Sequence, residues 1–278
     1  MSDEVSDQTS DQTSDKASNK KENETNKILA PTSLDTLNKG DINHYIAAEE
    51  LTPLLVGTEE VITLIKTSNT PNSKGTAILL PDWQQTATNP KSINFLRQHL
   101  PNEGWTTITI QPPSKPENYP STALTYSEQQ EENQLTIKAY HQQLSAIMLA
   151  VTEKAKGYPG IMMIIAEGQN AAHLASLYQQ NKNTVPEAFI LLSSYLSDTI
   201  ENQKFTADLA QTDYPVLDLY LTRDHPLALK SAALRLTSAN KAMKAFYRQK
   251  QLGNITTGYY PQHKLLSALN GWLKSMGW

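Results

Sequence analysis

Short apolar runs alternate with longer amphipathic stretches from about residue 59 to the C-terminus. Apolar or β-branched runs bounded by turn residues are typical of strands, and apolar residues three or four positions apart are typical of helices. We therefore predict strands over residues 59–68, 75–83, 104–113, 160–168, 188–196, 214–224 and 247–255, the last of them polar and at a sheet edge. Helices are predicted over 92–100, with Ser92 as its N-cap, and over 127–156, 169–180, 227–244 and 263–274.

This order of elements predicts an α/β fold with a doubly wound, mainly parallel sheet and helices on both faces. In such sheets a ligand binds in the crevice beyond the carboxyl ends of the strands. The loops expected to line that crevice are residues 81–87, 166–171, 193–198, 222–226 and 257–263.

The stretch "IIAEGQNAAHLA", residues 164–175, predicts a buried strand, a sharp turn and the start of a helix. In a hydrolase this context holds the nucleophile in a G-x-S-x-G motif, where small residues flank a strained turn. Here Gly168 stands at the position of the serine. Glycine tolerates the strained backbone but has no oxygen with which to attack a substrate. Ser193 and Ser194 follow another strand without an elbow pattern, and we favour them less as nucleophiles.

The two other positions of a Ser-His-Asp triad are occupied. Asp224 follows the strand "PVLDLYLTRD", and His263 lies between the last strand and the last helix. The chain order is therefore elbow, acid, histidine, as in the α/β hydrolases. Asp224 and His263 are either a surviving acid–base pair or an inherited structural hydrogen bond, and the sequence leaves both open. His225 is more typical of a turn residue because Pro226 follows it, and His173 of a packed or surface residue on the helix after the turn.

The chain after its first 30 residues resembles the α/β-hydrolase fold, and more narrowly the bacterial family of unknown function DUF3530. The resemblance rests on five phrases: "AILLPDWQQ" (77–85), "LRQHLPNEGWTTITIQPP" (96–113), "IIAEGQNAA" (164–172), "PVLDLYLTRD" (215–224) and "GWLKS" (271–275). It implies the hydrolase fold but no firm activity. It also implies an export signal, which is common in the family.

Four further residues, on the turn itself and on the loop over residues 81–87, are candidates for the site. Glu167 can act as a general acid or base if a partly apolar crevice raises its pKa, although a locally hydrogen-bonded turn residue is the simpler interpretation. In a hydrolase the loop that contains Asp82 and Trp83 contributes to the oxyanion hole, and the negative charge of Asp82 disfavours an oxyanion there. We therefore predict a ligand-binding role for Asp82, Trp83 and Gln169.

The N-terminal segment differs in composition from the rest of the chain. Residues 1–30 are polar and repeat "SDQT", so we predict a disordered acidic tail followed by one domain over residues 31–278. Residues 1–27 hold seven acids and four lysines, which leaves the rest of the chain close to neutral against a whole-chain charge of −4. No basic stripe with interleaved aromatic residues is apparent either, so we expect neither nucleic acid nor an anionic membrane surface as a partner.

Several classes of site are excluded or not expected. The chain has no Cys, which excludes thiolate chemistry and disulfides. No metal or other cofactor is expected, because ligand spacings and the glycine spacings of phosphate loops are absent. No apolar stretch is long enough to span a membrane. No signal peptide precedes the chain as given, so we expect a cytoplasmic protein, or a periplasmic one if an export signal is missing from this start.

These observations predict an uncharacterised α/β-hydrolase-fold protein that lacks the serine nucleophile. Our first hypothesis is a noncatalytic pseudoenzyme that binds a small molecule or a partner protein, or an envelope-associated protein. The alternative is an esterase-like hydrolase with a non-standard site built from Asp224 and His263, assisted by Glu167 and water. Fold alone does not decide between them.

Overall fold

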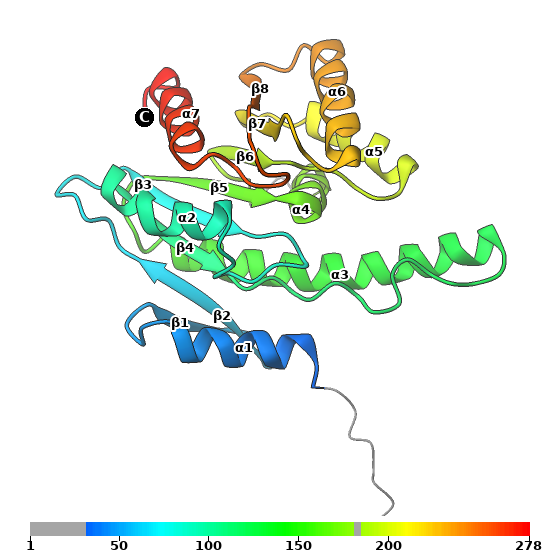
Figure 1. Ribbon diagram of the computed structural model, residues 1–278, viewed down its shortest axis with the longest axis horizontal. Helices are drawn as coiled ribbons and strands as arrows, with labels where there is room; N and C mark the ends of the chain where they lie inside the picture. Colours follow the sequence, from blue (N-terminus) through cyan, green and yellow to red (C-terminus); the bar gives the residue numbers. More distant parts are fainter. Residues whose placement is uncertain (1–31, 181–184) are drawn as a thin grey trace, which may run out of the picture. The chain divides into compact units, whose positions relative to one another are not determined.

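The computed structural model describes residues 32–180 and 185–278, so the predicted tail over residues 1–30 lies outside the described part of the chain (Figure 1). Eight strands form one sheet in the order β1-β2-β4-β3-β5-β6-β7-β8. The first two pairings, β1 with β2 and β2 with β4, are antiparallel, and all the others are parallel. The strands are β1 (Leu51–Val56), β2 (Glu59–Lys66), β3 (Gly75–Leu80), β4 (Trp105–Ile110), β5 (Ile161–Glu167), β6 (Ala188–Leu192), β7 (Val216–Leu221) and β8 (Tyr247–Leu252).

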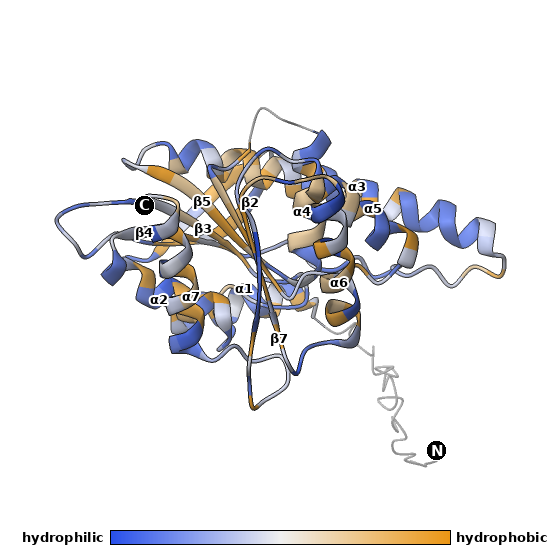
Figure 2. Cartoon of the chain, turned by 90° about the horizontal axis from the view of Figure 1, so that it is seen from above, coloured by the Kyte–Doolittle hydropathy of each residue, from blue (hydrophilic) through white to orange (hydrophobic). Residues whose placement is uncertain are grey.

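Helices cover both faces of the sheet, as the sequence predicts. One apolar layer joins the sheet to α3, α4 and α5, and a second joins the opposite face to α2 and α7. Figure 2 shows the strands as an apolar band between the helices. The helices are α1 (Leu34–Tyr45), α2 (Ser92–His99), the short 3-10 helix η1 (Leu100–Glu103), α3 (Tyr126–Ala155), α4 (Gly168–Gln180), α5 (Thr199–Ala210), α6 (Pro226–Lys241) and α7 (Gln262–Ser275).

Burial explains the character of the individual elements. Strands β3 and β4 are buried at every position and read as continuous apolar or β-branched runs. Strand β8 is the last in the sheet and alternates between exposed and half-buried residues, which confirms the predicted edge position. Helix α3 begins at a capping box formed by Thr125 and Glu128. Its buried residues start only at Ile137, so its first half is polar and projects beyond the sheet (Figures 1 and 2).

Several details differ from the sequence prediction. Helices α1 and α5 and strand β1 were not expected, because their apolar residues are few and interrupted by polar ones. Strands β6 and β7 end earlier than predicted, since the residues that follow them turn into the crevice. The N-cap of α2 is Lys91, not Ser92. Ser92 lies one position later, where its hydroxyl donates to Glu167.

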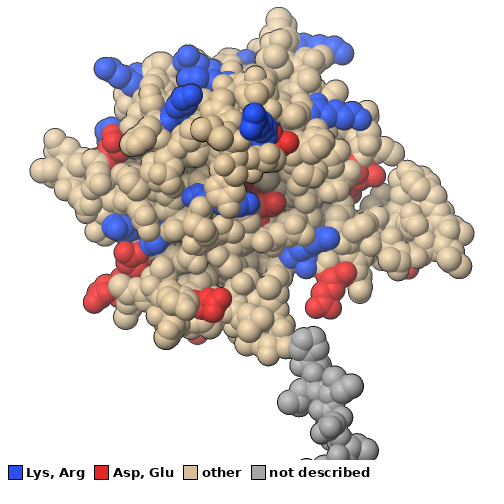
Figure 3. All heavy atoms as spheres, viewed as in Figure 1, with Lys and Arg blue, Asp and Glu red and all other residues tan. Residues whose placement is uncertain are grey.

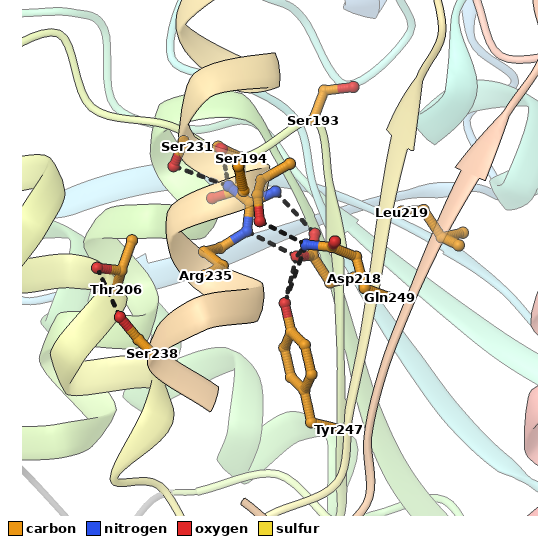
Figure 4. Close-up of polar contacts among 12 residues, drawn as sticks. Ser193, Ser194, Thr206, Asp218, Leu219, Ser231, Arg235, Ser238, Tyr247 and Gln249 are labelled. Carbon is orange, nitrogen blue, oxygen red and sulfur yellow. Dashed lines mark hydrogen bonds and ion pairs between the residues drawn. The ribbon is translucent and has the colours of Figure 1, made fainter. Parts of the chain in front are cut away.

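A buried polar network ties α6 to the sheet (Figure 4). Arg235 of α6 donates from Nε and Nη2 to both carboxylate oxygens of Asp218 on β7, at 2.7 and 2.9 Å. Tyr247 and Gln249 of β8 donate to the same carboxylate. Arg235 also donates to the backbone oxygen of Ser194, which follows β6. The network therefore fixes the loop after β6 as well as the helix.

No helix in the described residues is both long enough and apolar enough to cross a membrane.

Candidate functional site

A cavity of about 430 Å³ lies at the carboxyl ends of the central strands, where the parallel sheet predicts a ligand crevice. It receives residues from the loops after β3, β5, β6, β7 and β8. Its lining consists of Asp82, Gln84, Gln85, Asn89, Lys91, Glu167, Gly168, Ser193, Tyr195, Asp224, His225, Pro226, Thr257 and Gly258.

Gly168 forms the sharp turn between β5 and α4. Its φ angle is +61°, a left-handed conformation that side chains other than glycine rarely adopt. A Cβ atom built on Gly168 would lie 2.5 Å from Cγ of Asp82 and 2.6 Å from its Oδ2. The backbone angle favours glycine, and the Asp82 carboxylate leaves no space for a nucleophilic side chain at this turn.

The carboxylate of Asp82 occupies the space beside Gly168. Its Oδ1 atom accepts two backbone N–H groups, from Gln169 at 2.9 Å and from Trp83 at 3.0 Å. Burial raises the pKa of Asp82, and these backbone hydrogen bonds oppose that rise because they stabilise the ionised form. A single oxygen with two converging N–H donors at a helix N-terminus is the geometry of a bound anion. Here the anion is a side chain of the protein itself.

Glu167 is the last residue of β5 and lies at the bottom of the crevice. It is only 5% exposed, and Ser92 Oγ donates to its Oε2 at 2.9 Å. Burial raises the pKa of Glu167 to about 7, and the hydrogen bond from Ser92 limits that rise. A carboxyl group with this pKa changes its charge near neutral pH.

Asp224 is held by local contacts. It accepts hydrogen bonds from Ser193 Oγ at 2.5 Å and from the backbone nitrogens of Leu221 and His225 at 2.9 and 2.8 Å. Ser193 has a φ of +50°, so it adopts a strained conformation beside the cavity. Its hydroxyl also lies 2.7 Å from the hydroxyl of Tyr260, which donates to the backbone oxygen of Leu219.

His263, the predicted partner of Asp224, lies outside the cavity lining. It is an exposed residue in the first turn of α7 and does not line the cavity. The histidine that does line it is His225, whose ring stacks on Tyr195 with centroids 4.6 Å apart. His225 Nδ1 accepts the N–H of Leu227 and thereby caps α6, which leaves this nitrogen without a free lone pair for a substrate proton.

The predicted ligand-binding residues Trp83 and Gln169 contribute their backbones to the site, and their side chains do not line the cavity. Gln169 accepts a hydrogen bond from Ser197 at 3.2 Å. The ring of Trp83 is buried and packs edge-on against Tyr119 and Tyr140, and beside His173.

His173 is a packed residue of α4, as expected, and it has a partner that the sequence did not suggest. Its Nδ1 lies 3.0 Å from Nε2 of His141 on α3. Burial lowers the pKa of His173 to about 3 and that of His141 to about 4. Both rings are therefore neutral at physiological pH, and they pack against each other with His173 beside Trp83 and Tyr140.

The described residues contain no group of three or more His, Asp or Glu side chains arranged to hold a metal ion.

Comparison of the sequence with known protein families gives one match. The profile of the family described as "Protein of unknown function (DUF3530)" matches residues 2–275. The chain belongs to this family. No curated protein matches the sequence.

Solved structures show the same fold as the DUF3530 chain. Est1E from Butyrivibrio proteoclasticus, in a complex with ferulic acid, has a TM-score of 0.56 at 10% identity, over 81% of this chain and 98% of that one. A dienelactone hydrolase from Anabaena variabilis has a TM-score of 0.56 at 12% sequence identity, and the match covers 82% of this chain and 96% of that one. An alpha-beta serine hydrolase homologue from Coxiella burnetii has a TM-score of 0.54 at 12% sequence identity, and the match covers 83% of this chain and 99% of that one. The DUF3530 chain therefore has the α/β-hydrolase fold.

The two backbone N–H groups that bind Asp82 can be compared with those of the α/β hydrolases by their positions in the fold. In α/β hydrolases the oxyanion hole consists of the N–H after the nucleophile and an N–H from the loop after β3. Those positions are Gln169 and Trp83 in this chain. The carboxylate of Asp82 accepts a hydrogen bond from both. The sequence placed Asp82 in the loop after β3, but only the folded chain shows that its side chain turns back to these two N–H groups.

Proposed function

We propose that this DUF3530 protein is a noncatalytic member of the α/β-hydrolase fold that binds a small molecule in the crevice. The observation that carries the proposal is the Asp82 carboxylate on the N–H groups of Gln169 and Trp83. An oxyanion hole stabilises a reaction only if its donors are free for the developing charge. With the hole filled and glycine at position 168, the site supports neither nucleophilic attack nor oxyanion stabilisation.

The lining suggests the chemistry of the ligand. Three carboxylates, Asp82, Glu167 and Asp224, reach the cavity, together with the stacked rings of Tyr195 and His225. Carboxylates accept hydrogen bonds and attract positive charge, while an aromatic wall favours a flat or apolar body. A small molecule with hydrogen-bond donors at one end and an apolar or planar part fits this lining better than an anion does.

The alternative proposal, an esterase-like hydrolase that uses Asp224 and His263, has less support. It requires a histidine whose ring receives the nucleophile's proton and donates to Asp224. The described contacts of Asp224 are with Ser193 and two backbone nitrogens, and His263 is exposed on α7. Glu167 remains the group in the crevice best suited to proton transfer.

The test is a screen of small molecules by thermal shift on the full chain and on a Thr257→Trp variant. Thr257 is an exposed residue at the cavity, so a tryptophan there obstructs the crevice without disturbing the core. Thr122→Trp, at another exposed site, is the matched control. We expect ligands that stabilise the wild type and Thr122→Trp but lose at least tenfold in affinity for Thr257→Trp. Hydrolysis of short-chain aryl esters is measured in parallel.

Two results contradict the proposal. Ligands that bind Thr257→Trp as well as the wild type would show that the crevice is not the binding site. Ester turnover by the wild type that disappears in His263→Ala would establish the hydrolase instead.

A further inference from the structure

The C-terminal part of the chain has a strongly uneven charge. Residues 225–278 contain eight Lys or Arg and no Asp or Glu. Six of these basic residues are exposed: Lys230, Lys241, Arg248, Lys250, Lys264 and Lys274. Figure 3 shows Lys and Arg gathered on the upper part of the molecule, where α6, α7 and β8 lie, and Asp and Glu mainly below. The net charge of the domain is close to zero, but its C-terminal part therefore forms a basic region.

The turn between α6 and β8 places two large apolar side chains in solvent within this region. Met243 is 88% exposed and Phe246 is 64% exposed. Both have left-handed φ angles, +49° and +57°. Such angles are uncommon for residues with large side chains, and they persist only where neighbouring contacts hold the backbone. We call Met243 and Phe246 the apolar tip.

Lys244 supplies the contacts that hold the turn. Its ammonium group donates to Thr212 Oγ1 at 2.9 Å, to the backbone oxygen of Tyr214 at 3.1 Å and to that of Thr212. It also lies 5.5 Å from the ring centre of Tyr214. With Lys244 directed inward, its neighbours Met243 and Phe246 are directed outward. Exposure of the apolar tip is therefore fixed by the fold and does not reflect a loosely packed turn.

Basic residues flank the apolar tip in sequence, with Lys241 at the end of α6 and Arg248 on β8. The exposed carboxylate of Asp213 faces Lys244, whose own charge offsets it. The turn precedes β8, so it lies at the amino end of that strand, opposite the crevice at the carboxyl ends of its parallel neighbours.

We propose that the apolar tip and the basic residues around it bind the surface of an anionic lipid bilayer. Apolar side chains that enter the interface and cations that attract anionic headgroups are the two components of interfacial binding. Residues 225–278 contribute no acidic residue that would repel such a membrane, and the charge of the exposed Asp213 is offset by Lys244. The turn lies at the edge of the sheet opposite the crevice, so binding there leaves the crevice open to ligand. This interaction is independent of the ligand-binding role proposed above.

The test is co-sedimentation of the full chain with vesicles of phosphatidylcholine alone or with about a third of phosphatidylglycerol. We expect binding to the anionic vesicles only, weakened by salt because the attraction is electrostatic. Met243→Asn combined with Phe246→Asn removes the apolar tip, and asparagine tolerates a left-handed backbone, so the turn is retained. This double variant is expected to bind at least tenfold more weakly. Lys241→Gln combined with Arg248→Gln is expected to bind about 25-fold more weakly, since each basic residue near an anionic surface contributes roughly fivefold.

Leu124→Asn and Lys138→Gln are the matched controls, because they remove an exposed apolar and an exposed basic residue from the distant α3 region. Both should bind like the wild type. Absence of wild-type binding to anionic vesicles, or unchanged binding of the Met243→Asn/Phe246→Asn variant, would overturn the proposal. Self-association in sedimentation velocity that disappears in this variant, without vesicle binding, would identify the turn as a protein interface instead.

Discussion

Asp82 and Gly168 share a single space: a Cβ atom on Gly168 would lie 2.5 Å from Cγ of Asp82. The two residues are 86 positions apart in sequence and meet at the carboxyl ends of the adjacent strands β3 and β5. Each depends on the other. Glycine leaves room for the carboxylate, and the carboxylate fills the anion site that the turn creates.

The first prediction concerns that anion site. Asp82→Ala removes the acceptor of two N–H groups at the start of α4 and should lower the free energy of unfolding by about 1–3 kcal/mol. Formate or acetate at millimolar concentration should bind in the vacated site and raise the melting temperature of the variant but not of the wild type. Sodium chloride at equal ionic strength is the control, and equal responses of both proteins would contradict the assignment.

The second prediction concerns coupling between the two residues. Gly168→Ser should destabilise the wild type by about 2–4 kcal/mol, because it combines a positive φ with a clash against Asp82. In the Asp82→Ala background the clash is absent and only the backbone strain remains. A double-mutant cycle measured by urea unfolding should therefore give a coupling energy of about 1–2 kcal/mol. Strict additivity would show that the two side chains do not share this space.

The third prediction follows from the titration of Glu167. Its pKa is about 7 in the folded protein and 4.5 as an isolated side chain, so the folded state binds more protons between these values. Its contribution to stability is therefore present below about pH 4.5 and is lost as the pH rises to about 7. Relative to Glu167→Gln, the wild type should lose on the order of 3 kcal/mol across this window. Urea unfolding at several pH values measures the difference, and parallel curves for the two proteins would refute it.

The fourth prediction concerns the buried ion pair under the loop after β6. Arg235→Met leaves the carboxylate of Asp218 buried without its cation and should destabilise the protein by about 3–5 kcal/mol. Asp218→Asn in the same chain removes that uncompensated charge and should restore part of the loss. Lys230→Met, an exposed position on the same helix, is the control and should change stability by less than about 0.5 kcal/mol. A loss in the control as large as that in Arg235→Met would show that the ion pair is not the cause.

Much of the fold follows from local patterns in the sequence. Strands such as β3 and β5 are continuous apolar runs, and helices such as α6 start and end near the predicted residues, because burial on a parallel sheet imposes these patterns. The edge position of β8 was also visible in its polar alternation. Helix α1 and strand β1 were not visible in the sequence, because α1 buries a single residue and no residue of β1 is fully buried.

The site was predictable only in outline. The sequence by itself determined that the turn after β5 lacks a nucleophile, because that depends on the identity of one residue, Gly168. It also located Asp82, Glu167 and Asp224 on crevice loops, since parallel strands all end at one edge. Only the tertiary structure decided that Asp82 accepts the N–H groups of Gln169 and Trp83, that Ser193 binds Asp224 and that His263 faces solvent. These are contacts between segments far apart in the chain, and side-chain direction at a loop is set by packing rather than by local pattern.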